Sequence, residues 1–493
     1  MLYRRNTRLK PPVVRTFKLN AFGGYVTGVG ENTLSLSQSK YCLNYVARDG
    51  ELTQAYGTRS AKLDFETGLS YPIPRFSNNV SGVYQYEYSN KGTQDDRLLV
   101  HLSNGELYCL YVDRDDRDAH LLATSVWTIH GAFSYRLGSE DVMIIASNSG
   151  FYILRDDKLE LVETAPDVRH FCLHRERAFG ATESEPYKLW FTSNLDPSDW
   201  TVSPDGGGYI EFSKDNGRIK RVVSFLGYVY VFREYGIERI STYADQTDFE
   251  VLTIYSSTDR LYHNTVTVCG EKIVFLSEKG LHVFDGVNVN KISGIIEPED
   301  FRGKGDKAVA TYYKGNYMLS VYVKRFDDDK YKNSEPRTYS NNCIVCMSLD
   351  DGVVSVMSEY DVINFCVYKS TKGSNLIMVL HWNVQKEHMR IMMLDEEKCA
   401  RIGSVTYYYW QTGMTDLGYP EKKKMLESIT IAIKGTAVLS VMLDDVEIEL
   451  GRIMDGQNTF RVMRNFERFG FKLTGYGYKT QRVSPPVIKV SMR

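Results

Sequence analysis

The chain has 493 residues, of which 43% are hydrophobic, 13% aromatic and 25% charged. Its 60 basic and 62 acidic side chains give a net charge of −2, which excludes a protein drawn as a whole onto nucleic acid or an acidic membrane. The length suits two to four ordinary domains, or one large repeat domain with additions. With 35 Tyr, 22 Phe and only 13 Pro, the composition favours β-strands.

The N-terminus is a basic segment without acidic residues, so it forms a small local exception to the neutral charge of the chain. We interpret it either as an arm that is frayed or held by a partner, or as a direct contact to DNA phosphates. The candidate contact residues are Arg4, Arg5, Arg8, Lys10, Arg15 and Lys18.

No run of 18 apolar residues occurs, so we expect no membrane-spanning segment and no secretion signal. The eight cysteines are scattered through apolar strand-like text, which predicts buried free thiols in a reducing compartment. Cys343 and Cys346 have the spacing of a metal pair, but they lie in one predicted strand, where such positions face opposite sides. We therefore expect no metal site there.

A repeated hairpin pattern dominates the middle of the chain. Each copy is a strand, a short turn containing Gly and a second strand, and copies begin at Arg97, Asp141, Gly227, Glu271 and Asn341. The starts are separated by 44, 86, 44 and 70 residues, which indicates a unit of about 43 or 44. Two further copies are expected near residues 185 and 315, and matching text is present at both places.

A period of about 40 to 45 residues made of short strands is typical of a propeller blade. A single sheet cannot bury both faces, whereas a ring of sheets stacks each face on a neighbour. We predict an all-β fold: an N-terminal arm and docking strand segment over 1–60, a β-propeller of about six or seven blades over 61–400, and a C-terminal β-sandwich over 401–493. A stacked pair of sheets or an irregular β-solenoid is the structural alternative. Trp190 and Phe232 are expected to pack between neighbouring blades.

Signals for chemistry are weak. The acid-rich stretches 113–118, 327–330 and 349–352 sit at predicted turns and are expected to be solvated loops rather than calcium or catalytic sites. His170 and His174 share one side of a strand, but a metal needs further ligands. No Ser, His and Asp set is apparent, and no G-x-G piece opens a helix. We predict a protein without catalytic residues, metal or cofactor.

Three motifs in order carry a family resemblance. The first is a Gly-Gly turn at 23–24, followed by "CLN" at 42–44, an "RDG" turn at 48–50 and "GT" at 57–58. The second joins "LWFTSNLDPSDW", residues 189–200, through a Gly-rich strand to "VVSFLGYVYVFREYGIERI", residues 222–240. The third is "WQTGMTDLGYPEKKKMLESI", residues 410–429. Together the three motifs resemble the tail hub, or nozzle, propeller proteins of short-tailed phages, described as packaged-DNA stabilisation proteins.

The resemblance implies a structural virion protein that forms a homo-oligomeric ring, of six copies, at the head–tail connector or tail hub. Such a ring continues the DNA channel below the portal and adaptor rings, retains the packaged genome until ejection, and anchors tail fibres, spikes or a needle. Double-stranded DNA would pass without sequence-specific binding. The expected location is the phage tail, assembled in the bacterial host cytoplasm.

Two other functions remain open from the sequence. A carbohydrate-binding or glycan-cleaving propeller at the tail tip or baseplate would account for exposed aromatic residues and acidic turns. A cellular protein-interaction propeller is disfavoured, because no WD or kelch signature recurs in the repeats. The motifs do not separate a hub from a baseplate protein or a fibre anchor.

Overall fold

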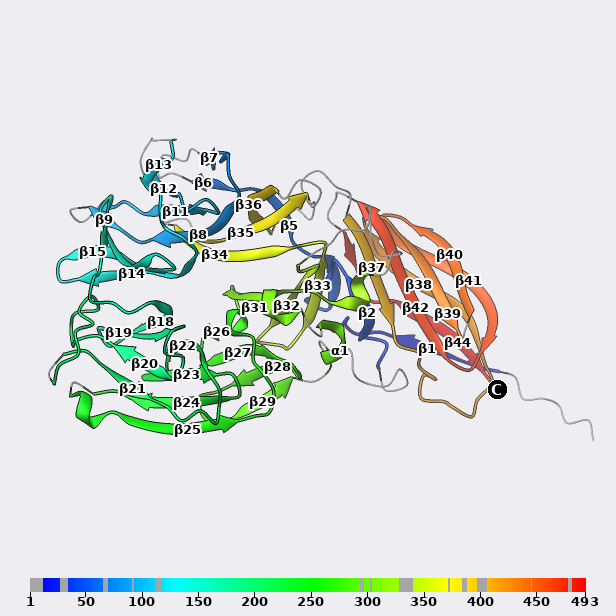
Figure 1. Cartoon of the computed structure of the whole chain (residues 1–493). Helices are drawn as coiled ribbons and strands as arrows, with labels where there is room; N and C mark the ends of the chain where they lie inside the picture. The colour runs from blue at the N-terminus through cyan, green and yellow to red at the C-terminus, as the bar shows by residue number, and fades with distance from the viewer. Residues whose placement is uncertain are drawn as a thin grey trace, which may run out of the picture. The chain divides into compact units, whose positions relative to one another are not determined.

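The computed structural model describes residues 12–26, 34–64, 70–90, 93–111, 118–204, 206–243, 245–292, 294, 297–301, 304–327, 340–370, 373–383, 388–396, 406–444, 446–477 and 481–493. These residues are almost entirely β-structure, which confirms the all-β prediction (Figure 1). Helix within these ranges is limited to α1 (Pro298–Phe301) and a few short 3-10 turns. The chain divides into two compact units: unit 1 comprises 1–58, 345–358 and 395–493, and unit 2 comprises 59–344 and 359–394.

Seven four-stranded antiparallel sheets occur among the described residues, in chain order. The first three contain β8 (Val80–Tyr86), β11 (Arg97–Leu102), β12 (Leu107–Tyr111) and β13 (His120–Ala123); β14 (Ile129–Leu137), β15 (Glu140–Ser147), β16 (Gly150–Arg155) and β17 (Lys158–Leu161); and β18 (Val168–His174), β19 (Arg177–Thr182), β20 (Lys188–Phe191) and β21 (Gly208–Glu211).

The fourth and fifth sheets contain β22 (Ile219–Phe225), β23 (Tyr228–Arg233), β24 (Gly236–Ser241) and β25 (Glu250–Ser256); and β26 (Thr267–Cys269), β27 (Lys272–Ser277), β28 (Gly280–Phe284) and β29 (Val289–Ile292). The sixth contains β30 (Val309–Tyr313), β31 (Asn316–Val321), β32 (Cys343–Ser348) and β33 (Val354–Ser358). In the seventh, β34 (Val362–Ser370), β35 (Gly373–Asn383) and β36 (His388–Asp395) are joined by the N-terminal strand β5 (Gly57–Ser60).

The predicted period therefore corresponds to a real structural unit, an arrangement of the β-propeller type. The copies expected near residues 185 and 315 are the hairpins β19–β20 and β30–β31. Two two-stranded ribbons, β6 (Lys62–Asp64) with β7 (Ser70–Pro72) and β9 (Ser89–Asn90) with β10 (Thr93–Gln94), complete the unit 2 strands.

Sheets of unit 2 bury their faces on each other. Every residue of β11 and β19, the second strands of their sheets, is buried, whereas the first strands β14 and β30 are mostly half-buried. Phe232 of the fourth sheet is fully buried against Phe275 of the fifth, with 5.6 Å between ring centroids, so its predicted place between sheets is confirmed. Trp190 is only half-buried, at the edge of the cluster between the second and third sheets.

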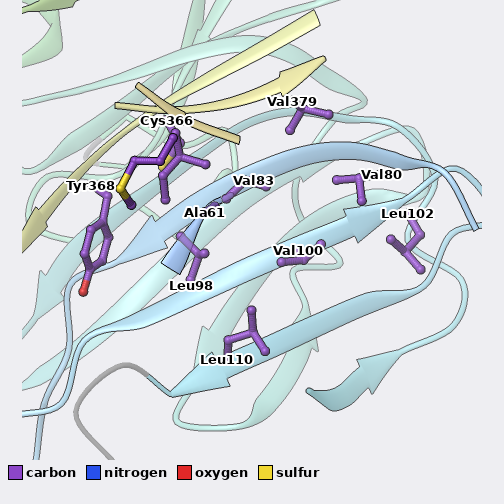
Figure 2. Packing of buried hydrophobic residues seen from close by; sticks show 12 residues of the cluster. Ala61, Val80, Val83, Leu98, Val100, Leu102, Leu110, Cys366, Tyr368 and Val379 are labelled. Atoms are coloured by element: carbon purple, nitrogen blue, oxygen red, sulfur yellow. The ribbon is translucent and has the colours of Figure 1, made fainter. Parts of the chain in front are cut away.

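The first and last sheets of unit 2 also pack on each other. Figure 2 shows apolar side chains of β8 and β11, such as Val83 and Leu98, packed with Cys366 and Val379 of β34 and β35. Polar contacts run alongside: the Gln85 amide donates to the Lys369 carbonyl at 2.7 Å and accepts from the Lys369 N–H at 2.7 Å. These partners are 284 residues apart in the sequence, so the hydrogen bonds join the first sheet of the repeat to the last.

Five of the first strands share a β-bulge near their start, where one extra residue is left out of the pairing with the second strand. The bulged residues are Ser81, His130, Arg169, Lys220 and Ile363. A bulge re-aims the side chains around it. Equivalent residues thus occupy the same position in five of the four-stranded sheets.

Unit 1 contains two larger sheets. One has the order β1-β44-β38-β43-β4-β3, with β41 paired to β38, and the other has the order β2-β37-β42-β39-β40. The strands are β1 (Val13–Lys18), β2 (Ser39–Leu43), β3 (Tyr45–Arg48), β4 (Glu51–Gln54), β37 (Thr406–Thr412), β38 (Lys424–Lys434), β39 (Ala437–Leu443), β40 (Val446–Ile453), β41 (Gly456–Phe466), β42 (Phe469–Gly477), β43 (Arg482–Val483) and β44 (Val487–Met492). N-terminal strands therefore contribute to both sheets.

We predict that Phe232→Ala lowers the free energy of unfolding by about 3 to 5 kcal/mol, because it opens a cavity between two sheets. Trp190→Ala should cost less, since the indole is only half-buried. Denaturant unfolding of both variants measures this, with Leu226→Ala, at an exposed turn residue, as the control. An equal loss of unfolding free energy in Trp190→Ala and Phe232→Ala would contradict the difference in burial between the two side chains.

Candidate functional site

Two of the six basic residues predicted to contact a partner or DNA, Arg15 and Lys18, lie on β1. The other four, Arg4, Arg5, Arg8 and Lys10, lie outside the described residues. The Arg15 Nη1 donates to the Tyr419 hydroxyl at 2.5 Å, and its guanidinium lies 4.9 Å from the centre of the same ring. One of the predicted contact residues is therefore engaged within its own unit.

The strand β1 is the outermost strand of its sheet, since it pairs with β44 and ends the strand order. Its residues are largely exposed, including Val13 and Val14 at 59% and 54%. An edge strand presents one row of backbone N–H and C=O groups to further pairing, and exposed apolar side chains favour it. The basic residues 4–10 directly precede this edge.

The motifs at the N-terminus hold backbone segments of unit 1 together. Gly24 lies against the chain at Val354, where an added Cβ would come within 2.7 Å of the Val354 nitrogen, and Tyr25 N–H donates to the Val354 carbonyl at 2.9 Å. Asn44 has a positive φ of 58° and its amide donates to Ser358 Oγ and to the Tyr407 carbonyl, each at 2.8 Å. Both motifs are structural in this unit.

The "RDG" motif forms the turn of the β3–β4 hairpin. Asp49 and Gly50 both have positive φ, 50° and 77°, as a tight two-residue hairpin turn requires. The Asp-Gly pair meets this requirement with little strain, because glycine lacks a Cβ and aspartate tolerates the left-handed region.

The loop of the second motif, which leaves β20, is folded by its own side chains. Ser193 Oγ donates to Asp199 at 2.6 Å and Ser198 Oγ donates to Asp196 at 2.5 Å. Trp200 is 1% exposed and packs on Phe151 of the preceding sheet, with 5.3 Å between ring centroids. The carboxylates of this loop thus shape the turn that places Trp200 between two sheets.

The seven described cysteines are free and buried, which confirms the prediction of buried thiols. Burial raises the pKa of the Cys172 thiol to about 12 and that of Cys346 to about 11. A thiol is nucleophilic as its thiolate, so these groups are not activated at neutral pH.

His170 and His174 contact different partners. The His170 ring lies 5.0 Å from that of His263, whereas His174 Nδ1 is 2.8 Å from Ser224 Oγ. Burial lowers the pKa of His174 to about 4. Across the described part of the chain, no group of three or more metal-ligating side chains comes together.

A buried ion pair lies inside the fourth sheet. Arg233 Nη1 donates to Glu238 at 3.1 Å, and the two side chains are 0% and 5% exposed. Arg233 also donates to the carbonyls of Ser213 and Gly217. Burial raises the pKa of Glu238, opposed by Arg233 and Asn216. The pair joins the strand β23 to the loop before β22, so we interpret it as structural.

Among the described residues, no helix has both the length and the apolar character needed to cross a lipid bilayer.

No family model and no curated protein matches this sequence. Solved structures with partial similarity include BBS1N in complex with ARL6DN (TM-score 0.44, 11% identity, 69% of this chain and 98% of that one), and Raptor of Chaetomium thermophilum (0.44, 8%, 70% and 29%). The Neurospora crassa Pan2 WD40 domain is a third (0.39, 10%, 65% and 90%). At this level of similarity nothing about the function of the chain follows.

We predict that Arg233→Met lowers the free energy of unfolding at pH 7 by about 3 to 5 kcal/mol, because Glu238 is left buried and unpaired. In this variant the pKa of Glu238 in the folded state lies above that in the unfolded chain, which is about 4.3. The folded state therefore keeps the Glu238 proton to a higher pH than the unfolded chain does. The penalty is therefore absent at low pH and grows as the pH rises. Denaturant unfolding between pH 4 and 8 measures it.

The exposed pair of Arg218 with Glu183 provides the control, since Arg218→Met should change stability by less than about 1 kcal/mol. The double variant Arg233→Met, Glu238→Leu should regain most of the lost stability. Its stability should no longer depend on pH in the way that of Arg233→Met does, because the titrating carboxyl is gone. A pH-independent loss in Arg233→Met would show that Glu238 is not the cause.

Proposed function

We propose that this chain is a structural virion protein of a bacteriophage, assembled as a ring of copies at the head–tail connector or tail hub. The observation that carries the proposal is the order of the three motifs, from residue 23 to residue 429, in a molecule of stacked sheets. The ring continues the DNA channel, retains the packaged genome and anchors other tail components.

The contacts of the motif residues support this role. Gly24, Asn44 and Asp49 fix turns and backbone contacts within unit 1, and Trp200 seals two sheets of unit 2. Residues that serve packing are what a scaffold requires, and none of these four is held as a reactive group. A fold alone does not determine a function. The proposal is therefore tested by whether the chain assembles into rings.

We further propose that the seven four-stranded sheets form a closed propeller and that the two larger sheets of unit 1 form a β-sandwich. First strands contact in succession: β8 with β14, β14 with β18, β18 with β22, β26 with β30, β30 with β34, and β34 with β8. The turn before β26, which contains His263, contacts β22. A closed ring leaves no end sheet with an uncovered face, and such a ring would resist deformation under the internal pressure of packaged DNA.

The N-terminus provides the proposed contact between copies or to an adaptor ring. The sequence places four basic residues at 4–10, directly before the exposed edge strand β1. Backbone pairing along an edge gives affinity, and the flanking charges favour an acidic partner surface or a DNA phosphate. With a net charge of −2, the whole chain has no general attraction for the DNA that passes through the ring.

Mass photometry of the purified chain, followed by negative-stain imaging, tests the proposal. Rings of several copies with a central channel, and recovery of the chain in purified virions, support it. Absence from virions overturns it. A 56.5 kDa monomer that binds or cleaves glycans on an array would favour the alternative, a carbohydrate-directed propeller at the tail tip or baseplate.

We predict that replacing Arg4, Arg5, Arg8 and Lys10 together with Gln reduces ring assembly while leaving the melting temperature unchanged, because these residues precede the paired strand β1. Native mass spectrometry and thermal unfolding measure the two effects. The control replaces the exposed Lys422 and Lys423 with Gln. If the fourfold variant still forms complete rings, these four residues do not contribute to the contact between copies.

A further inference from the structure

Basic side chains gather at one level of unit 2, near the start of the first strands. In three consecutive sheets the bulged residue is basic: His130 on β14, Arg169 on β18 and Lys220 on β22. His170 and Arg221 follow directly on β18 and β22, and His263 lies in the turn before β26. These six residues are called the basic arc below.

The members of the arc are close neighbours. Arg169 Nη1 lies 2.8 Å from His130 Nε2, and the His170 and His263 rings lie 5.0 Å apart. Burial first, and then the neighbouring basic groups His263, Arg221, His130 and Lys220, holds the pKa of His170 well below its usual value. Burial first, then Arg221 and Lys220, lowers the pKa of His263 to about 4, although Asp306 opposes this. Both imidazoles are therefore neutral at pH 7.

Carboxylates reach only the rim of the arc. Lys220 is 3.2 Å from Glu234 and Arg169 is 3.9 Å from Asp167. Burial lowers the pKa of His130, and the hydrogen bond to Asn148 and the charge of Glu183 only partly oppose this. The interior of the arc, formed by His170, Arg221 and His263, has no ion pair to a carboxylate within the described residues.

Two polar atoms inside the arc lack a hydrogen-bond partner. His170 Nδ1 and Arg221 Nε are both buried and unpaired within the described part of the chain. Burial lowers the pKa of the Arg221 guanidinium, and the only group that opposes this is the Cys172 thiol, which its own raised pKa, about 12, keeps neutral. The Arg221 side chain as a whole is half-buried, and its Nε is the guanidinium atom that is buried without a partner. A guanidinium with an unpaired Nε and no carboxylate partner in the described part of the chain, beside the unpaired His170 Nδ1, has the chemistry of an anion site.

We propose that the basic arc binds an oxyanion of the phosphate class. Arg221 supplies the planar fork of donors that suits phosphate oxygens, and His170 and His263 supply ring N–H donors. Arg169 and Lys220 add positive charge at the rim. The bound anion satisfies the unpaired donors and compensates the Arg221 charge. This site is independent of the proposed role in assembly, because it lies within one chain.

Calorimetric titration of the full-length chain with inorganic phosphate, and separately with a short single-stranded oligonucleotide, tests the site and separates a free phosphate from a nucleic acid phosphodiester. We expect saturable one-to-one binding of at least one of the two. Arg221→Gln should weaken it by about 10- to 100-fold, the effect of losing a charged hydrogen-bond partner. Arg136→Gln, at the exposed opposite end of β14, should leave it unchanged.

Nitrogen NMR of the wild-type protein provides a reading that does not depend on the folding of a variant. Phosphate or oligonucleotide should shift the ring-nitrogen resonances of His170 and His263 and leave His101, buried in the first sheet, unperturbed. His263→Gln identifies its signal. No binding by the wild-type protein, or binding that leaves both histidines unshifted, would overturn the proposal.

Discussion

The contact between the first and last sheets of unit 2 is the constraint on which the other packing depends. Each sheet buries its second strand on both faces, so each needs a neighbour on either side. The two end sheets find theirs in each other through the apolar cluster around Ala61 and Leu98 and the paired hydrogen bonds of Gln85 with Lys369. Without that contact, two sheet faces would be exposed and their bordering clusters would lose half of their partners.

The repeated order of the strands places equivalent residues of successive sheets at one level, and it gives the first strands a different environment from the second strands. First strands such as β14 and β30 are mostly half-buried, and β18 likewise carries half-buried polar side chains at Arg169 and His170. A β-bulge near the strand start changes which side chains lie together. The basic arc follows from this geometry, whereas Arg233 is buried inside a single sheet with Glu238 as its partner. The presence or absence of a carboxylate separates a structural arginine from a candidate ligand-binding one.

The sequence predicted the parts of this fold that local patterns specify. Alternating apolar residues and Gly turns identified the hairpins, and their spacing located the copies at β19–β20 and β30–β31. It did not predict that strand β5 completes the sheet of β34–β36, because that pairing joins segments more than 300 residues apart. Nor did it identify the basic arc. The corresponding residues are "IHG", "VRH" and "IKR" at the starts of three strands. An aliphatic residue followed by a basic one is common, and only the bulges in the structure show that these basic residues occupy equivalent positions.

The motifs that carry the family resemblance and the residues of the basic arc occupy different places, and this bears on how function is distributed. Gly24, Asn44 and Asp49 define backbone geometry in unit 1 and would tolerate no change of conformation. Four residues of the arc lie outside the second motif, at positions 130, 169, 170 and 263. Lys220 and Arg221 lie between its two runs, directly before Val222. A scaffold needs these backbone contacts, whereas the Nε of the half-buried Arg221 has no partner within the described fold. The proposed anion would provide that partner, which makes the arc a function added to the fold rather than a part of it.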